Sequence, residues 1–413
     1  MNQLRTNAIY PEFRSKGPSP FYPDQPVPVE LFRGRTPQIE HILQRGVAQV
    51  AAGKPVTMFV EGEYGIGKSS IAAFTQWQAE MKYGLHGVYV TLGGARGLED
   101  VAEQILSATV RSGAFNPTRG EKIRNWLAKY LGEQQLFGLS LNLAALKQDA
   151  PTFQSVGNLL QFLGETIFRL KDTGVRGIFL ILDEINGITG EPGFVHFLKG
   201  LVDTNALSRP PIPLLLMLCG VEERRRELVQ RHEPVGRIFD IVKIERMTDE
   251  EMRDFYSTSF ANVNMRVDDN AMAVLIQFAA GFPKIMHLIG NAAYWLDEDG
   301  RIDEKDAQAA VVAAADEVGR KYVTQQVYAA LRSRDYHSIL AKIATINPYA
   351  TSFTKAEVEA GLTQSEKGKF NNFIQRMKRL KVIRSGENRG EYVFNVRMVH
   401  LYIYLQSIQK TKV

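Results

Sequence analysis

One stretch of sequence decides the fold, Gly62-Glu63-Tyr64-Gly65-Ile66-Gly67-Lys68-Ser69. An apolar run from Val56 to Val60 precedes it and helical spacing follows Ser69, so the local order is strand, loop and helix. Glycines allow backbone N–H groups in such a loop to turn toward an anion at the positive end of a helix dipole. The pattern is typical of a phosphate-binding loop, in which Lys68 reaches the β and γ phosphates and the Ser69 hydroxyl binds Mg²⁺.

The loop therefore predicts that the protein binds ATP with Mg²⁺. Glu63 is unfavourable beside phosphates, and we expect its side chain to point outward. The alternative is a plain glycine-rich turn. We expect the following residues to bind the nucleotide: Gly62, Gly65, Ile66, Gly67, Lys68, Ser69 and Ser70.

A second apolar run, Ile178 to Leu182, ends in the carboxylates Asp183 and Glu184. Ligands of open α/β sheets bind at the carboxyl ends of the strands, so Asp183 is placed to hold the water shell of Mg²⁺. Glu184 follows as the candidate base that orients a water molecule on the γ-phosphate. The alternative is an acidic pair that merely ends a strand. The loop and this acidic pair together predict an ATPase that produces ADP and phosphate. We expect Lys68 to be a catalytic residue alongside Glu184.

Other short apolar runs predict a parallel sheet. Residues 87–92, 214–218 and 240–244 alternate with helical stretches, which is typical of an α/β sheet covered by helices on both faces. Thr36 suits the N-cap of a helix, with Pro37 in its first turn. Residues 137–143 also alternate like a strand, inside a long stretch, 95–170, to which we assign no role.

Composition and length limit the class of protein. Apolar residues make up 45% of the 413 and charged residues 23%, as in ordinary globular proteins of two or three domains. The longest uncharged apolar run, Pro211 to Val221, is far shorter than the roughly 20 residues of a membrane-spanning helix. The N-terminus does not look like a signal peptide, Cys219 is the single cysteine, and the histidines lack metal-ligand spacing. We expect a cytoplasmic protein with no membrane partner.

Positive charge is concentrated near the C-terminus. Residues 331–413 contain 15 Lys or Arg and 6 Asp or Glu, an excess of nine, whereas the whole chain carries +5, so the remainder carries about −4. Such an asymmetry favours an acidic partner for the C-terminal part, most simply nucleic acid. The alternative is a basic surface that is only solvated.

Three further motifs surround the phosphate-binding loop: Phe32-Arg33-Gly34-Arg35, Leu214-Leu215-Leu216-Met217-Leu218-Cys219-Gly220 and Gly281-Phe282-Pro283-Lys284. With them, the chain from about Leu31 to Asp316 resembles the AAA+ ATPases, nearest to the origin-recognition and initiator branch and to transposition ATPases of the ExeA kind. The resemblance implies an α/β fold, an AAA+ parallel-sheet P-loop core with a helical lid. It places Phe32 and Arg35 near adenine. Cys219 stands where the family usually has a polar sensor, and Lys284 stands in the second sensor motif where arginine is common.

The resemblance also implies self-association through the ATP site. In such proteins an arginine from a neighbouring subunit completes the site, because a fixed guanidinium best meets the charge of the transition state. Arg237 sits where the resemblance places that residue. A surface or interdomain ion pair is the alternative role for Arg237, and the run Arg224-Arg225-Arg226 is another candidate.

The last 80 or so residues are interpreted as a winged helix. Thr354 to Glu357 fit a capping box that opens one short helix, and Ser365 is a candidate cap for the next. Phe370, Phe373, Ile374, Met377 and Leu380 share the apolar face of that second helix, and residues 382–394 predict a basic hairpin. Polar residues that can contact phosphates and base edges lie on the other face and in the hairpin. These are Lys369, Asn372, Gln375, Arg376, Arg379, Arg384 and Arg389.

Four segments follow from these patterns: a proline-rich arm at 1–28, the AAA+ core at 29–247, the helical lid at 248–320 and the winged helix at 321–413. Our first hypothesis is a switch that binds ATP between core and lid, oligomerises, and couples its nucleotide state to double-stranded DNA. The second is a signalling ATPase that controls a separate effector protein, for example in prokaryotic defence, with the winged helix used only for packing. A metabolic P-loop kinase is a third class, in which the sensor and lid motifs have no role.

Overall fold

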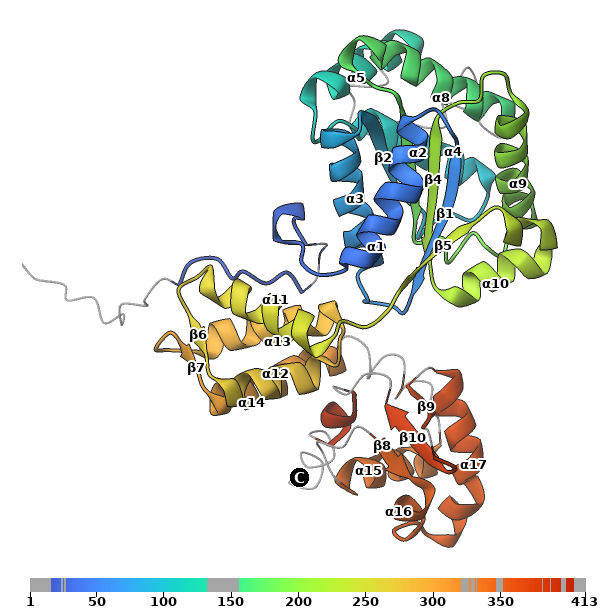
Figure 1. The fold of residues 1–413 in the computed structure, drawn as a ribbon. Helices are drawn as coiled ribbons and strands as arrows, with labels where there is room; N and C mark the ends of the chain where they lie inside the picture. The colour runs from blue at the N-terminus through green and yellow to red at the C-terminus, as the bar shows by residue number, and fades with distance from the viewer. Residues whose placement is uncertain are drawn as a thin grey trace, which may run out of the picture. The chain divides into compact units, whose positions relative to one another are not determined.

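The computed structural model describes residues 16–23, 25, 27–131, 156–320, 327, 331, 333–346, 352–380, 382–386, 388–394 and 399–404. Within them the chain divides into two compact units (Figure 1). The core unit combines Gln25–Met247 with Phe282–Lys284. The helical unit comprises the described parts of Met1–Asp24, Thr248–Gly281 and Ile285–Val413. The strand-like segment 137–143 lies outside the described residues, and the four-segment division of the sequence stays a prediction.

A five-stranded sheet forms the centre of the core unit, in the order β2-β3-β4-β1-β5. Every neighbouring pair is parallel, which confirms the predicted parallel α/β sheet. The five predicted runs are all present, with ends displaced by at most two residues. The strands are β1 (Val56–Gly62), β2 (Leu85–Thr91), β3 (Gly177–Asp183), β4 (Leu214–Gly220) and β5 (Asp240–Ile244).

The register of the strands brings their carboxyl ends together. Val60 of β1 is paired with Cys219 of β4, Leu218 of β4 with Leu182 of β3, and Asp183 at the end of β3 with Thr91 of β2. Because β4 lies between β1 and β3, the phosphate-binding loop and Asp183 emerge at the same edge of the sheet with Cys219 between them.

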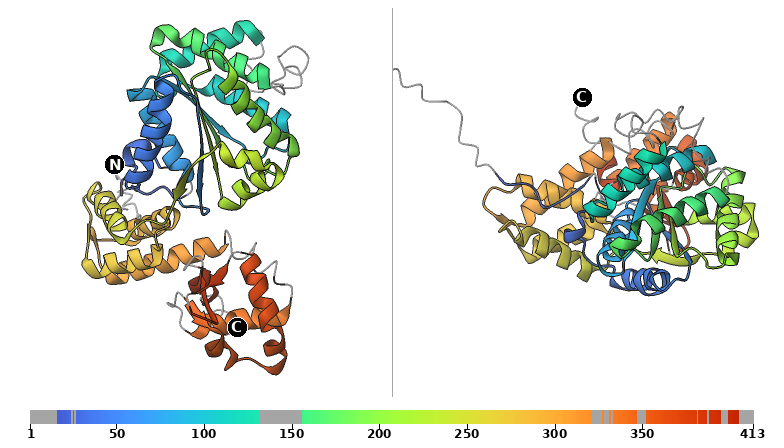
Figure 2. Two further views of the ribbon diagram at one scale, coloured as in Figure 1. Left: turned by 45° about the vertical axis from the view of Figure 1, so that its right-hand side comes forward. Right: turned by 90° about the horizontal axis from the view of Figure 1, so that it is seen from above.

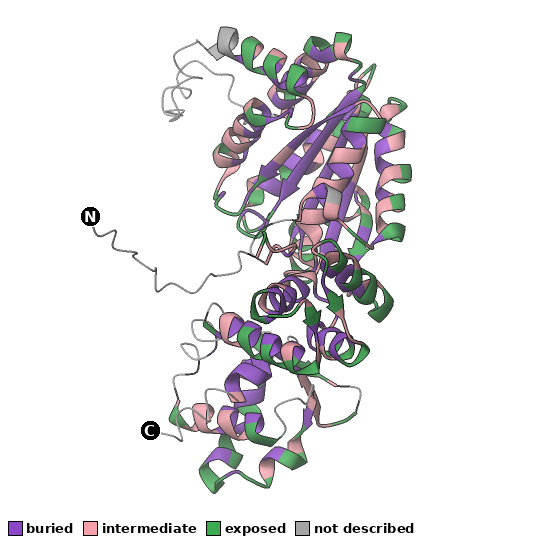
Figure 3. Ribbon diagram, turned by 90° about the vertical axis from the view of Figure 1, so that its left-hand side faces the viewer, coloured by how far each residue is buried: buried purple, intermediate pink, exposed green. Residues whose placement is uncertain are grey.

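Helices cover both faces of the sheet (Figure 2). On one face, Phe59, Leu180 and Leu216 belong to a buried core that includes residues of α4, α5, α8 and α9. On the other face, a Cβ placed on Gly46 would meet the side chains of Met58 and Leu215, so the turn η2 packs directly on the sheet. The central strands β3 and β4 are therefore buried throughout their length, whereas the edge strand β5 exposes Ile241 and Lys243 (Figure 3).

The remaining elements of the core unit are helices and short 3-10 or π-helical segments. Thr36 is already helical, and the N-cap of α1 is Arg35, so the predicted cap is wrong by one residue. The helices and turns are η1 (Val29–Leu31), α1 (Thr36–His41), η2 (Ile42–Val47), α2 (Ala48–Ala51), α3 (Lys68–Lys82), α4 (Leu98–Arg111), α5 (Pro117–Leu131), α8 (Val156–Leu170), η3 (Lys171–Thr173), α9 (Pro192–Leu207), α10 (Glu222–Arg231) and η4 (Glu233–Arg237).

The first part of the helical unit is a small bundle. Its elements are α11 (Asp249–Ala261), β6 (Arg266–Val267), α12 (Asp269–Ala279), α13 (Pro283–Leu296), β7 (Arg301–Ile302) and α14 (Glu304–Val318). Thr248 caps α11 reciprocally with Glu251, as a capping box requires.

Part of the predicted N-terminal arm is anchored in this bundle. The ring of Phe21 is 4% exposed and packs edge-on against Phe255 and Phe260 of α11. A Cβ on Gly290 of α13 would lie 2.3 Å from the ring of Phe21, so only glycine leaves room for it. Lys16 donates to the carbonyl of Tyr294, and residues 1–15 lie outside the described residues.

The C-terminal part contains helices around a three-stranded antiparallel sheet of order β8-β10-β9. Its elements are α15 (Arg334–Ile346), β8 (Ser352–Thr354), α16 (Lys355–Glu359), α17 (Gln364–Arg379), β9 (Ile383–Ser385) and β10 (Glu391–Phe394).

Helices α16 and α17 each begin with a capping box. Thr354 and Glu357 form the predicted one at α16. The cap of α17 is Thr363 with Glu366, and Ser365 lies inside the helix, so the predicted cap at Ser365 is wrong. The threonine two residues earlier has the glutamate at the spacing that a capping box needs.

Candidate nucleotide site

The loop between β1 and α3 has the backbone shape that a phosphate requires. Gly65 and Gly67 have φ values of 76° and 101°, a left-handed region that favours glycine. Gly67 is the N-cap of α3, and no side chain caps the first turn of that helix, whose N–H groups are thus placed to face an anion. Lys68 begins the helix, and Ser69 and Ser70 follow in its first turn.

The ammonium group of Lys68 is held over the loop. It donates to the carbonyl oxygens of Gly62 at 3.0 Å and Glu63 at 2.8 Å. Burial lowers the pKa of Lys68, while nearby acidic groups, including Asp183 and Glu184, act in the opposite direction. A partly desolvated cation gains more from a phosphate partner than an exposed one does, because the competing hydration is weaker.

Asp183 is buried and accepts one hydrogen bond on each carboxylate oxygen. The Tyr89 hydroxyl donates to Oδ2 at 2.6 Å, and the backbone N–H of Glu184 donates to Oδ1 at 2.8 Å. Tyr89 is not among the residues that the sequence motifs predict for the site. In the sequence, Tyr89 is recognisable only as a hydroxyl-bearing side chain near the end of a predicted strand. Its contact with Asp183 depends on β2 lying beside β3.

Glu184 follows in a conformation that side chains rarely adopt, with a φ of 56°. Its side chain is exposed at the end of β3. A Cβ on Gly93, just after β2, would lie 2.5 Å from Oε2 of Glu184, so the glycine leaves room for the carboxylate. The two predicted acidic residues are thus separated in role: Asp183 is buried and fixed, and Glu184 is exposed.

The expected Mg²⁺ site needs only one or two protein ligands. Among the described residues, no group of three or more His, Cys, Asp or Glu is arranged to hold a metal ion. Mg²⁺ usually keeps several waters and takes one or two protein ligands together with substrate phosphates. The Ser69 hydroxyl and the buried Asp183 carboxylate are oxygen donors of the kind that fits this requirement.

Solved structures resemble the whole architecture, although no family model and no curated protein matches the sequence. The Walker-type ATPase PABY2304 of Pyrococcus abyssi has a TM-score of 0.58 at 16% identity, over 90% of this chain and 96% of that one. The ORC2 protein of Aeropyrum pernix, solved in ADPNP and ADP complexes, has a TM-score of 0.56 at 14% identity, over 92% and 95%. The chain shares the fold of these two proteins.

The segment Phe32-Arg33-Gly34-Arg35 supports the loop. Arg35 is 5% exposed, and its guanidinium donates to the carbonyl oxygens of Ile66, at 3.2 Å, and Glu245. Phe32 stacks on Phe74 of α3 with ring centroids 4.8 Å apart. Arg35 therefore links the loop to the end of β5, and the adenine contacts of Phe32 and Arg35 stay predictions.

Lys284 lies against the loop as well. The backbone N–H of Lys284 donates to Gly65 O at 3.4 Å, and the Lys284 ammonium lies 5.6 Å from the ring centre of Tyr64. Glu63 is exposed and forms an ion pair with Arg246 at 3.4 Å, which agrees with the expected outward orientation of its side chain.

Cys219 differs from a polar sensor in its chemistry. The side chain is fully buried, and burial raises the pKa of the thiol well above its ordinary value. A neutral thiol is only a weak hydrogen-bond donor. The strong donor that reaches Asp183 from an adjacent strand is Tyr89.

Arg237 is placed differently from the neighbouring arginine run. Its side chain is 83% exposed, and among the described residues its ion-pair partner is the exposed Glu233, at 4.0 Å. Arg225 instead pairs at 2.6 Å with Glu61, which is 7% exposed. Arg224 and Arg226 pair with glutamates of their own helix. Arg237 is therefore the better candidate for a contact outside this chain.

The predicted nucleic-acid residues fall into two groups. Asn372, Gln375, Arg379, Arg384 and Arg389 are exposed and Arg376 is half-buried. Lys369 is paired with Asp335 at 2.6 Å, so part of its charge is already neutralised. Phe370, Phe373, Ile374 and Met377 are buried on the other face of α17, as predicted.

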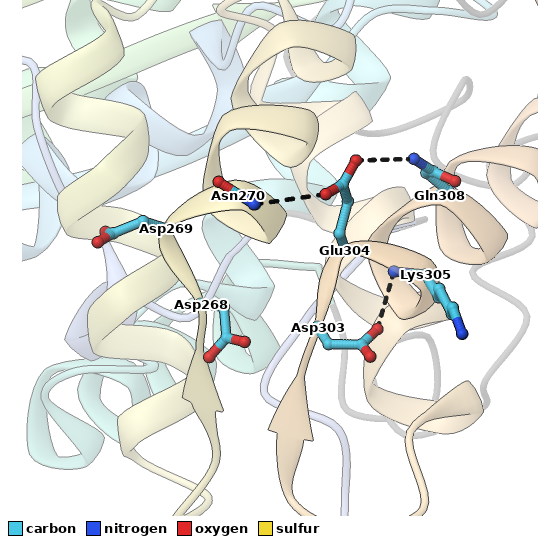
Figure 4. Close-up of a pocket in the computed structure, with 7 residues that line it drawn as sticks. All are labelled: Asp268, Asp269, Asn270, Asp303, Glu304, Lys305 and Gln308. Carbon is cyan, nitrogen blue, oxygen red and sulfur yellow. Dashed lines mark hydrogen bonds between the residues drawn. The ribbon is translucent and has the colours of Figure 1, made fainter.

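An acidic hollow in the helical unit has a structural explanation. It lies at the N-termini of α12 and α14, and at α14 the Asp303 carboxylate accepts from the backbone N–H of Lys305 (Figure 4). Asp268 pairs with Arg301, and Glu304 accepts from Asn270 and Gln308. The hollow is lined by Asp268, Asp269, Asn270, Asp303, Glu304, Lys305 and Gln308.

Proposed function

We propose that the protein is a molecular switch that binds ATP with Mg²⁺, hydrolyses it to ADP and phosphate, and couples its nucleotide state to double-stranded DNA. One observation carries the proposal: Lys68, Asp183 and Glu184 emerge from β1 and β3 at the same edge of a parallel sheet, beside glycines that leave backbone N–H groups free. This edge is where ligands of open α/β sheets bind.

Each residue of the site has a distinct role in this proposal. The first turn of α3 and Lys68 bind the phosphates, and Ser69 and Asp183 hold Mg²⁺. The metal, when bound, neutralises charge on the phosphate oxygens. Glu184 orients the attacking water and accepts its proton, for which its exposed carboxylate at the strand end is suited.

The exposed Arg237 completes the site of a neighbouring subunit. A guanidinium supplied in trans links hydrolysis to self-association, because the site is then fully assembled only in the oligomer. The exposed ion pair with Glu233 offers little resistance to this exchange, since such pairs contribute about 0–1 kcal/mol.

We assign the C-terminal part as a winged helix that contacts DNA through α17 and the β9–β10 hairpin. The supporting observation is that Arg379, Arg384 and Arg389 are exposed and have no ion-pair partner among the described residues. Such free cations bind phosphates and release counterions from the DNA.

The deciding experiment measures binding to double-stranded DNA over a range of salt concentrations, with and without ATP and Mg²⁺, and then sizes the same samples. Tight, salt-sensitive binding that ATP strengthens, with larger assemblies, supports the switch. Lys68→Ala should lose ATP binding and the ATP effect together, and Lys54→Ala, an exposed lysine before β1, is the matched control. If the protein bound no DNA either with or without ATP and Mg²⁺, the partner proposed would instead be an effector protein.

A further inference from the structure

We infer that Tyr89 is a positioning residue for the metal end of the nucleotide site, where its hydroxyl fixes the carboxylate of Asp183 beside the start of α3. This inference rests on the proposed function. The residue belongs to none of the sequence motifs. It lies within a strand, two residues before the end of β2.

The Tyr89 hydroxyl lies close to both residues that are expected to hold the metal. It lies 2.6 Å from Oδ2 of Asp183 and 3.5 Å from the backbone oxygen of Ser69. A phenol has one proton, and the short distance assigns it to Asp183. The longer contact shows that the same oxygen also lies against the first turn of α3, from which the Ser69 side chain projects.

The two hydrogen bonds to Asp183 act as a pair. Tyr89 occupies one carboxylate oxygen, and the backbone N–H of Glu184 occupies the other at 2.8 Å. A carboxylate has about four acceptor positions, so both oxygens keep capacity for the water shell of a metal ion. With one donor on each oxygen, rotation of the carboxylate is restricted, which is how residues behind a metal ligand tune metal affinity.

Tyr89 is also chemically suited to this role. A tyrosine hydroxyl carries one proton at neutral pH and is a good hydrogen-bond donor. Cys219, on the other side of Asp183, supplies only a thiol. Loss of the Tyr89 hydroxyl therefore leaves Oδ2 of Asp183 without its strong donor.

Tyr89→Phe removes the hydroxyl and little else. The readout is equilibrium binding of a fluorescent ATP analogue, first in EDTA and then as Mg²⁺ is added. We expect the affinity in EDTA to stay within about twofold of wild type, because the loop and Lys68 are intact. The Mg²⁺ concentration for half-maximal enhancement should rise about tenfold, the usual scale for groups that orient a metal ligand.

Two comparisons separate positioning from a general loss of stability. Tyr256→Phe removes a hydroxyl that is more buried and donates to Met286 O at 3.2 Å, in the helical unit, and should leave the Mg²⁺ midpoint unchanged. In an Asp183→Asn background, Tyr89→Phe should cause no further shift in the midpoint, because the group that it positions is already altered.

A wild-type Mg²⁺ midpoint in Tyr89→Phe, with a shifted midpoint in Asp183→Asn, would overturn the inference and leave the proposed function standing. An equal rise in the midpoint in Tyr256→Phe would also overturn it, because general destabilisation would then be the cause. If the wild-type protein bound no ATP analogue at all, the proposed function itself would fail. A shift confined to Tyr89→Phe and Asp183→Asn supports the inference.

Discussion

Glu184 is held in an unfavourable backbone conformation at the end of β3. A non-glycine residue at a φ of 56° costs on the order of 1 kcal/mol or more, and it persists only where the surroundings impose it. Here the N–H of Glu184 is bonded to Asp183 Oδ1, and Gly93 leaves space for the carboxylate. This backbone conformation directs the Glu184 side chain away from the buried strand that contains Asp183.

Glu184→Gln should bind ATP with near wild-type affinity and hydrolyse it about 10²–10⁴ times more slowly, because the amide cannot accept a proton from water. Single-turnover hydrolysis and ATP affinity should be measured on the same preparation. Glu191→Gln alters a glutamate at the N-cap of α9 and serves as the matched control. Wild-type turnover in Glu184→Gln would remove this residue as the base.

His86 predicts how the core unit responds to acid. It is completely buried, and burial, with Arg119 nearby, lowers its pKa to about 4. The unfolded chain, with a histidine pKa of about 6.5, binds more protons between pH 6.5 and 4. The contribution of His86 to stability is therefore complete above pH 6.5 and is lost as the pH falls toward 4.

Between pH 7 and pH 5 this loss amounts to about 2 kcal/mol. The free energy of unfolding in urea, measured at both pH values, should fall by about that much more in wild type than in His86→Gln. Glu80, whose pKa is raised by burial, titrates in both proteins and cancels in the comparison. Equal pH dependence in the two proteins would show that His86 is not the responsible group.

At the scale of an element, α17 presents an apolar face and a polar face. Its apolar side chains are buried, while Arg379 is exposed and Arg376 half-buried on the opposite side. Replacing Arg376 and Arg379 with alanine should weaken DNA binding and reduce the slope of log K against log salt by about 2, roughly 0.9 for each lost phosphate contact.

Lys54→Ala with Lys82→Ala is the matched control for this pair, since it removes the same charge from exposed positions of the core unit. The control slope should equal that of wild type. An unchanged slope in the arginine double variant would contradict the proposed DNA-binding face of α17.

Helix α13 depends on one glycine. Gly290→Ala would place a methyl group 2.3 Å from the ring of Phe21, and such overpacking typically costs about 1–3 kcal/mol. Phe21→Ala alone should also destabilise the bundle, by about 3–5 kcal/mol. In the double variant the cost of Gly290→Ala should largely disappear, because the clashing ring is gone.

Gly157→Ala is the control for this cycle, because a Cβ at that position of α8 meets nothing within 4 Å. It should be neutral or stabilising in thermal unfolding. Additive effects of Gly290→Ala and Phe21→Ala would mean that the two residues do not share one packing site.

The elements show what the sequence can reveal and what needs the fold. Apolar runs predict all five strands, and the loop at 62–69 predicts the site, because these signals are local. The cap at Thr363 was missed although its partner Glu366 was visible, since Ser365 competed for the same role. Tyr89 could not be found, because its partner Asp183 is 94 residues away and only strand order brings them together.

At the scale of the whole molecule, Arg237 tests whether the active assembly is larger than one chain. Arg237→Ala and Glu184→Gln should each be inactive alone, and a mixture should recover roughly a quarter of wild-type turnover, because one interface in four then combines an intact Glu184 with an intact Arg237. Steady-state hydrolysis at fixed total protein measures this recovery. A mixture that stays inactive would place the function of Arg237 within its own chain.

The docking of Phe21 has a consequence for the making of the protein. Lys16, Gly17 and Tyr22 bond to partners 278, 277 and 265 residues later in the chain. At a synthesis rate of about 5–20 residues per second, the N-terminal segment waits roughly 13–55 s on the ribosome before α13 emerges. During that time the core unit is translated and can fold. The Phe21 side chain, which is buried in the folded protein, stays exposed and accessible to chaperones. The segment around Phe21 is thus ordered only after the much later helix α13 has been synthesised.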